Sequence, residues 1–364
     1  MSATAGPETG VSGGARAPRS LRSALLGRTF GPALFDYLLI GGGLSVIWTA
    51  VMRWTRVGPD SLPAPDLALL LLLANSTHFA SSSVRLYAKP GAVQAMPRLT
   101  LVFPLVTLLV LTLAIAGADA GGGNLYALYL TWSPYHFAAQ AFGLAVMYSY
   151  RSGCMLSATD KRLLRWTCLL PFFYSFVSGA GAGADWLLPA EWLALPAVGI
   201  TRDALRALLR VLVFVAPFLV FARVWRGGRP MPLISLLVVV ANGIWWITLV
   251  HMQAFLWATI FHGIQYLVIV VIFHVKDQEA LPTNRRSRLY HAAWFYGTSL
   301  VLAYGLFHLL PRGYAWAGFG YTESLLMVVA AINLHHFIVD GFIWRLARGS
   351  SNRRIVDDGL AKAA

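Results

Sequence analysis

Long, uninterrupted apolar runs dominate the hydrophobic pattern of this chain. The runs at 99–118 and 231–250 contain no charged residue. A helix needs roughly 20 apolar residues to cross about 30 Å of hydrocarbon. A membrane core cannot hydrogen-bond an open backbone, so repeated runs of this length predict a bundle of α-helices.

We expect an all-α, polytopic integral membrane bundle of about ten transmembrane helices. Most of the lysines and arginines fall in the two tails and in every second loop between these segments. Since basic loops stay in the cytoplasm, this pattern predicts that both chain ends are cytoplasmic. Arginine strongly outnumbers lysine. This bias is typical of a GC-rich genome and favours a multi-pass protein of the bacterial inner membrane. The expected helices lie at residues 31–54, 66–87, 99–118, 125–150, 162–181, 204–225, 231–250, 253–275, 290–310 and 322–345.

The domain organisation predicted from this pattern is simple. Residues 1–28 are rich in Gly, Ala, Ser, Pro and Arg and lack an apolar face, which predicts a disordered cytoplasmic tail. Residues 29–348 form one transmembrane helical domain. Residues 349–364 form a second cytoplasmic tail.

Composition supports the membrane interpretation. Of the 364 residues, 57% are hydrophobic and only 12% are charged, with a mean hydropathy of +0.63. The net charge of +14 might have indicated nucleic acid. The basic residues instead form short clusters between apolar runs, without an interleaved basic–aromatic patch. We therefore expect membrane lipids as partners and no nucleic acid.

The two cysteines restrict the chemistry. Cys154 and Cys168 form neither a CxxC nor a CxxCH motif. Covalent c-type haem and cysteine-ligated zinc are therefore excluded as the basis of a site.

The histidines concentrate at one depth in four of the expected helices. All four helices run inward in this topology, and their histidines fall in a layer about 8 Å thick near the membrane centre. An ionisable side chain at that depth is costly, which makes it a functional hypothesis. Imidazoles presented by several helices in one layer are also how a bundle builds a metal site. These residues are His78, His136, His262, His335 and His336.

Polar residues accompany these histidines at helical spacing. Asp340 follows His336 by four residues, so it can share its face and serve as a ligand or as the partner that orients the ring. Gln140 and Tyr266 also follow a histidine by four residues, and we expect them to be catalytic residues that face the substrate or support the site. The adjacent His335 and His336 are about 100° apart around a helix. Either one of them is not a ligand, or the site holds two ions.

These residues predict a membrane-embedded metalloenzyme, an oxidoreductase of the oxygenase or desaturase type with a hydrophobic, lipid-soluble substrate. Imidazoles with one carboxylate suit iron, which we prefer, or copper or zinc, and argue against magnesium and calcium. One alternative is a transporter or channel that uses the histidines as a proton or metal relay. Another is a haem b-binding protein with axial histidines from two helices. The ordinary structural alternative is that each histidine is simply hydrogen-bonded inside the bundle.

The order of His78, HGIQY and LHH resembles that of the catalytic subunit of haem–copper oxidases, but the later H-x-H haem-ligand pattern of that family is missing. The HxxxH and HxxHH boxes of fatty-acid desaturases are missing too. A multi-helix, four-histidine iron site is similar to that of membrane carotenoid-cleaving oxygenases, although no motif here is specific to them. The sequence therefore assigns no family.

Overall fold

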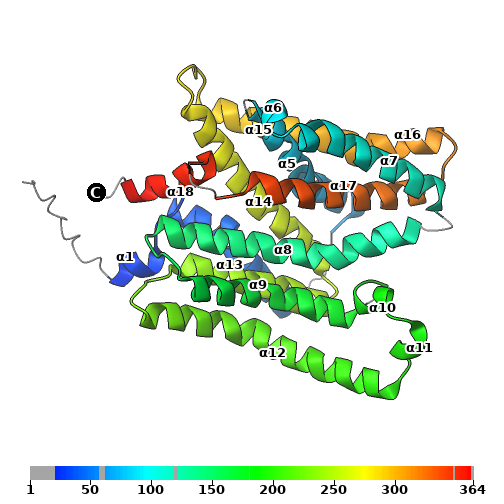
Figure 1. Ribbon diagram of the computed structural model, residues 1–364, viewed down its shortest axis with the longest axis horizontal. Coiled ribbons are helices and arrows are strands. Elements are labelled where there is room, and N and C mark those ends of the chain that lie inside the picture. Colours follow the sequence, from blue (N-terminus) through cyan, green and yellow to red (C-terminus); the bar gives the residue numbers. More distant parts are fainter. Residues whose placement is uncertain are drawn as a thin grey trace, which may run out of the picture.

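The computed structural model describes residues 21–56, 62–89, 91–118, 122–179, 181–346 and 349–361. Within these ranges the secondary structure is entirely helical, with no strand (Figure 1). The all-α fold class is confirmed, and each of the ten expected apolar segments is helical. Residues 1–20 and 362–364 of the predicted tails lie outside the described ranges.

Several spans combine α-helical with π-helical segments, which are labelled η. The first half of the chain contains α1 (Leu21–Leu26), α2 (Ala33–Phe35), η1 (Asp36–Ile40), α3 (Gly43–Thr55), α4 (Ala64–Leu70), η3 (Leu71–Ser76), α5 (Thr77–Ala88), α6 (Ala92–Ala95), η4 (Arg98–Val102), α7 (Phe103–Ala116), α8 (Gly123–Arg151) and α9 (Ala158–Ser178). The second half contains α10 (Ala184–Leu187), α11 (Ala190–Leu193), α12 (Pro196–Arg226), α13 (Leu233–Gly243), η6 (Ile244–Leu249), α14 (Phe255–Glu279), α15 (Arg288–Tyr304), η7 (Gly305–Leu309), α16 (Leu310–Trp316), α17 (Tyr321–Ile343) and α18 (Ser351–Ala361).

Among the described residues, six helices are long and apolar enough to cross a membrane. A seventh span results if α2 and η1 are counted together with α3, to which they are inclined by 60°. The break falls at Gly42, whose φ of +84° favours glycine. The chain therefore has the helices of a multi-pass membrane protein. Three expected spans fall outside this set. The α8 and α9 helices carry many polar residues, and α13 with η6 forms a shorter apolar helix, Leu233–Leu249, so the count of ten spans stays a prediction.

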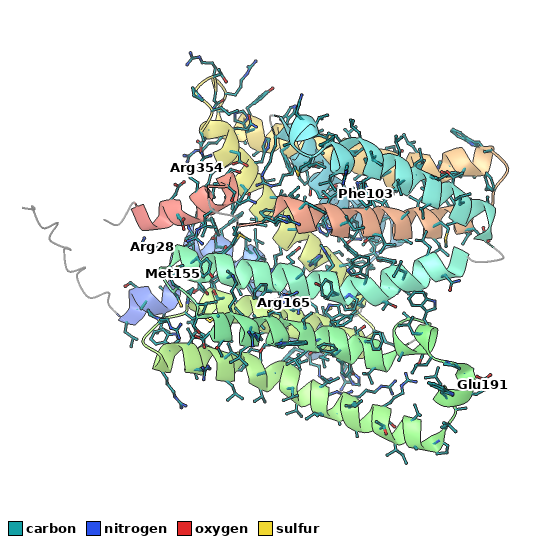
Figure 2. All side chains as sticks on the ribbon, viewed as in Figure 1. Arg28, Phe103, Met155, Arg165, Glu191 and Arg354 are labelled. Atoms are coloured by element: carbon teal, nitrogen blue, oxygen red, sulfur yellow. The ribbon has the colours of Figure 1, made fainter. Side chains whose placement is uncertain are left out.

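The long helices lie side by side (Figure 1). From one side of the bundle, α12 packs on α9, α9 packs on α8, and α8 packs on α17. The α17 helix also contacts α7 and α5, and α14 packs on α5 and α15. The α1 and α18 helices lie at one end of the bundle, and α11 lies at the other. Arg28 and Arg354 mark the first end and Glu191 the opposite end (Figure 2).

The centre of the bundle is formed by α14 and α17. In their most apolar windows, 61% and 56% of the residues are buried, against 22% in the spans formed by α7 and by α12. The outer helices expose large apolar side chains such as Leu105 and Leu219, which a lipid phase would solvate. The polar groups on the buried faces of α14 and α17, such as His262 and His336, are thus shielded from both water and lipid.

Two local features bring the histidine-bearing helices together. Gly263 lets α14 approach η3, because a Cβ at this position would lie 2.7 Å from the carbonyl oxygen of Ala74. This close approach sets His262 of α14 beside His78 of α5. In α8, Pro134 lies inside the helix, which changes direction along its length in Figure 1.

Candidate metal centre

Four of the five histidines singled out in the sequence meet in one buried cluster. They come from four helices: His78 from α5, His136 from α8, His262 from α14 and His336 from α17. The ring centroids of His78 and His336 are 4.4 Å apart, and those of His136 and His336 are 4.8 Å apart. His262 lies 4.9 Å from His78 and 5.3 Å from His136. All four side chains are buried.

Three of these rings are arranged as metal ligands would be. One nitrogen each of His78, His136 and His336 lies within 4.8 Å of the other two. The Nε2 atoms of His136 and His336 are only 3.2 Å apart. A tetrahedral ion with bonds of about 2.0–2.1 Å holds neighbouring nitrogens about 3.3 Å apart. The three imidazoles could therefore hold a metal ion after small adjustments.

A hydroxyl group orients His336. Its Nδ1 lies 2.9 Å from Oγ of Ser82, one turn after His78 on α5. When Nδ1–H donates to Ser82, the lone pair of Nε2 faces His136 and is available to a metal. Such a hydrogen bond to the remote nitrogen is the usual way in which a protein fixes the tautomer of a ligating histidine.

Two rings in the cluster have no hydrogen-bond partner among the described residues. Both ring nitrogens of His78 and both of His262 are buried and unpaired. An unpaired buried polar group typically costs about 1–3 kcal/mol. His262 is held by stacking on Phe137, with ring centroids 3.6 Å apart. A metal ion bound in the cluster would satisfy such nitrogens.

His335 faces away from this cluster. Its Nδ1 lies 2.9 Å from Oγ1 of Thr107 on α7, and its ring stacks on Phe103 at 4.6 Å. The structure therefore brings His336 into the cluster and sets its neighbour against another helix. This divergence follows from the rotation of about 100° between adjacent helical residues.

Asp340 connects the cluster to Tyr266. Its Oδ2 lies 3.4 Å from Nε2 of His336, and its Oδ1 accepts a hydrogen bond of 2.5 Å from the Tyr266 hydroxyl. The Tyr266 oxygen in turn accepts a hydrogen bond of 3.1 Å from Nε1 of Trp344. Asp340 therefore stands where it can ligate an ion bound by His336, while Tyr266 fixes the orientation of the carboxylate.

Gln140 is held beside the cluster by a second polar chain. Its Nε2 donates to Oε1 of Gln265 at 2.8 Å, and Nε2 of Gln265 donates to the carbonyl of Ile40 at 2.6 Å. Gln265 is buried on α14, three residues after His262. The Gln140 side chain is thus fixed without contacting a histidine nitrogen.

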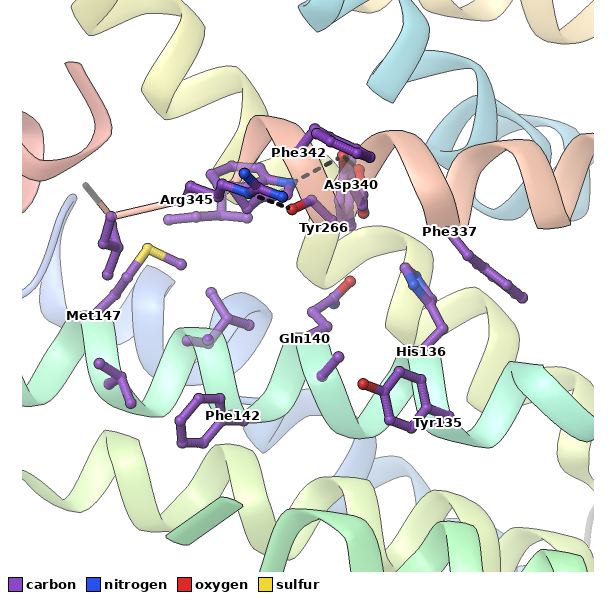
Figure 3. Close-up of a pocket in the computed structure, with 18 of the residues that line it drawn as sticks. Tyr135, His136, Gln140, Phe142, Met147, Tyr266, Phe337, Asp340, Phe342 and Arg345 are labelled. Atoms are coloured by element: carbon purple, nitrogen blue, oxygen red, sulfur yellow. Dashed lines mark hydrogen bonds between the residues drawn. The ribbon is translucent and has the colours of Figure 1, made fainter. Parts of the chain in front are cut away.

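A cavity of about 590 Å³ adjoins one side of the cluster (Figure 3). It lies between α8 and α17, with α14 behind them. His136, Gln140, Tyr266 and Asp340 all line it, so a bound molecule could approach an ion held by His136. The other histidines of the cluster do not line the cavity. Its remaining walls are largely apolar, formed by residues that include Trp132, Phe142, Met147, Ile269, Phe337 and Phe342.

Several residues that contribute to the site or to its surroundings were not predicted from the sequence. Ser82 and Arg85 follow His78 by four and seven residues, so both belong to its helical face, and this spacing was the available signal. Arg85 is almost fully buried, 3.4 Å from Asp277, with its guanidinium 4.9 Å from the Trp344 ring. Nothing in the sequence pattern points to the stacking of Phe137, which depends on how α8 and α14 pack.

The sequence matches no family model, and the comparisons with curated proteins and with solved structures gave no match. The function is therefore argued from the geometry of this cluster and of its cavity.

Proposed function

We propose that the protein is a membrane-embedded metalloenzyme, an oxidoreductase that acts on a lipid-soluble substrate. The observation that supports it most directly is the group of three buried imidazoles, His78, His136 and His336, with one nitrogen each within 4.8 Å of the others. Histidines in a membrane interior are rare and tend to mark functional sites.

Iron is the metal we prefer, with copper and zinc as alternatives. Two imidazoles and one carboxylate are the ligand set of many non-haem iron oxygenases. His136 and His336 supply the two imidazoles, with their Nε2 atoms 3.2 Å apart. Asp340 would supply the carboxylate, since its Oδ2 lies 3.4 Å from Nε2 of His336. His78 adds a third imidazole, and the cavity leaves room for an oxidant and a substrate. When bound, the metal would activate dioxygen for oxidation of the substrate.

The cavity suggests the roles of the neighbouring residues. Because its walls are largely apolar, it favours a lipid-soluble molecule over a hydrophilic one. Tyr266 has a hydroxyl within hydrogen-bonding distance of Asp340 and lines the cavity, so it is the residue best placed to exchange a proton near the metal. Gln140, fixed by Gln265, would orient the substrate.

The geometry argues against haem as the cofactor. Axial histidines on opposite sides of a haem iron are separated by two metal–nitrogen bonds, about 4 Å, with the macrocycle between them. The Nε2 atoms of His136 and His336 are 3.2 Å apart. This separation suits neighbouring ligands of one ion and leaves no space for a porphyrin between the rings.

A proton relay is the second candidate function. His336, Asp340 and Tyr266 form a continuous polar chain, with separations of 3.4 and 2.5 Å. A relay of this kind would need no metal. It therefore predicts proton flux across liposomes by metal-free protein, which the enzyme proposal does not.

We further propose ten spans in the bacterial inner membrane, with both chain ends in the cytoplasm. The clustering of basic residues between apolar segments supports this orientation. Reporter fusions at Ser157 and Ala364 should read cytoplasmic, and fusions at Gly122 and Pro189 should read periplasmic. A periplasmic reading at Ala364 would mean an odd number of spans.

The proposed function is tested by reconstituting purified protein with ferrous iron under anaerobic conditions. We expect stoichiometric iron, no Soret band, and a paramagnetic ferrous–nitrosyl signal on addition of nitric oxide, because a catalytic iron keeps an open position. Asp340→Asn should alter that signal, whereas Glu323→Gln, at the start of α17, should leave it unchanged. A Soret band would establish haem instead. Metal-free protein that carries protons would establish the relay.

A further inference from the structure

The cavity beside the cluster has two chemically different ends. His136 lines one end, and Asp340 and Tyr266 lie between it and Arg345 (Figure 3). Lys161, at the start of α9, and Arg345, just after the end of α17, line the other end. Figure 3 shows Arg345 and Met147 at one end of the drawn cavity and His136 and Phe337 at the opposite end.

The two cations have no carboxylate partner among the described residues. The Lys161 ammonium lies 5.8 Å from the Tyr150 ring, and the Arg345 guanidinium lies 4.7 Å from the Phe342 ring. The only hydrogen bond that the described structure gives the Arg345 side chain runs to the carbonyl of Gly341. Both side chains are exposed, so their charges remain available to an anion.

Between its two ends most of the cavity wall is apolar, with Gln140 as a polar group on α8. Leu144 and Met147 of α8 and Ile269 of α14 contribute to its walls, together with Phe142 and Leu346. From Met147 to His136 the wall follows α8 for about 16 Å at ~1.5 Å per residue. The cavity thus has a cationic end and a mostly apolar wall that leads to the histidines. This arrangement complements a molecule with an anionic head and a long apolar chain.

We propose that the cavity binds a single-chain amphiphile, with its anionic headgroup between Lys161 and Arg345 and its chain extending past Met147 to His136. The volume of about 590 Å³ suits one ligand of this kind. The Asp340 carboxylate lies 3.4 Å from His336 and would repel an anion near the histidines, which sets the direction of binding. This inference rests on the proposed function and names its substrate class: the metal would act on the chain, far from the head.

The test is equilibrium binding to the full-length protein in neutral detergent, with radiolabelled palmitate and hexadecanol as probes. We expect palmitate to bind more tightly than the alcohol of the same chain length, and affinity to rise along a series of longer fatty acids. The charge reversal Lys161→Glu with Arg345→Glu should weaken palmitate binding by about tenfold and leave hexadecanol binding unchanged.

The control is Arg162→Glu with Arg354→Glu, which makes the same change of net charge at exposed residues that do not line the cavity. It should bind palmitate like wild type. Equal affinity for acid and alcohol, or equal losses in both double variants, would overturn the proposal. So would displacement of palmitate by an equal concentration of phosphatidylglycerol, which would indicate an ordinary lipid contact.

Failure of this inference can be distinguished from failure of the proposed function. The Lys161→Glu, Arg345→Glu variant should retain the metal content of wild type, since neither residue contacts a histidine of the cluster. Protein that holds metal but does not discriminate palmitate from hexadecanol would contradict the substrate class alone. Protein that discriminates them but binds no metal would contradict the proposed enzyme. It would still support an anion-binding site at Lys161 and Arg345.

Discussion

The Nε2 atoms of His136 and His336 lie 3.2 Å apart, although 200 residues separate them in the chain. This contact depends on the packing of α8 against α17 in the middle of the bundle. Two imidazole nitrogens so close are compatible with one ring donating to the other or with both binding one ion. The unpaired nitrogens of neighbouring His78 favour the ion, because a hydrogen bond between the first two rings leaves His78 unsatisfied.

Ser82 is expected to control metal affinity through His336. Its Oγ lies 2.9 Å from Nδ1 of that ring, so Ser82→Ala should free the ring and reduce metal affinity by roughly 10–100-fold. Ser81→Ala is the matched control, because Ser81 is equally buried but bonds to the backbone carbonyl of His78. Competition with a chelator measures both affinities. Equal affinities in the two variants would mean that Ser82 has no part in the site.

Asp340 should raise metal affinity because its carboxylate is charged. Asp340→Asn keeps the shape of the side chain but weakens any bond to a metal, and we expect a loss of roughly 10–100-fold in metal affinity. The same change disturbs the acceptor of the Tyr266 hydroxyl, so Tyr266→Phe separates the two effects. Tyr266→Phe should retain most of the metal. If Asp340→Asn binds metal like wild type, the site is built from histidines alone.

Gly263 should be intolerant of a side chain. An added Cβ would lie 2.7 Å from the Ala74 oxygen and 3.0 Å from its carbonyl carbon, and both belong to the backbone of η3. Gly263→Ala should therefore destabilise the protein by about 1–3 kcal/mol. It should also lower the metal content, since α14 must move away from η3 and thus from His78, which follows η3 on α5. Gly297→Ala on α15 meets no atom within 4 Å and should be neutral or slightly stabilising. Thermal unfolding in detergent measures both, and similar melting temperatures would show that α14 adjusts freely.

Lys89, just after the end of α5, should make stability depend on pH. Burial, together with nearby Arg85, lowers the pKa of Lys89 to about 8, while Asp277 partly opposes this shift. Between pH 8 and the ordinary value of 10.5 the unfolded chain then binds more protons than the folded protein, so this contribution to stability rises with pH. Lys89→Met should be more stable than wild type near pH 7, and the difference should shrink towards pH 10. Parallel melting curves across that range would contradict a depressed pKa.

The depth of the histidines could be predicted because membrane thickness fixes where each helix begins and ends. Residues at similar distances from the ends of their helices then share a layer, and His78, His136 and His262 do meet. The direction of a side chain around its helix is harder to predict. Periodicity separates His335 from His336 by about 100°, but it cannot tell which of the two faces the cluster.

Features that depend on packing could not be predicted. The π-helical turns of η3 and η6 shift the register of the residues that follow, and no pattern in the sequence marks them. The close approach at Gly263 is visible only once η3 is in place. The cavity arises between α8 and α17, so its cationic end combines Lys161 and Arg345, which no local motif connects.

The metal content of purified histidine variants tests the central claim most directly. We predict stoichiometric metal in wild type and a large loss in His78→Ala, His136→Ala and His336→Ala, with a monodisperse size-exclusion profile in each case. His335→Ala, which changes a ring bonded to Thr107, should retain the metal content of wild type. Equal losses in His335→Ala and His336→Ala, or a wild-type protein that binds no metal when supplied with iron, copper and zinc, would contradict the buried metal site.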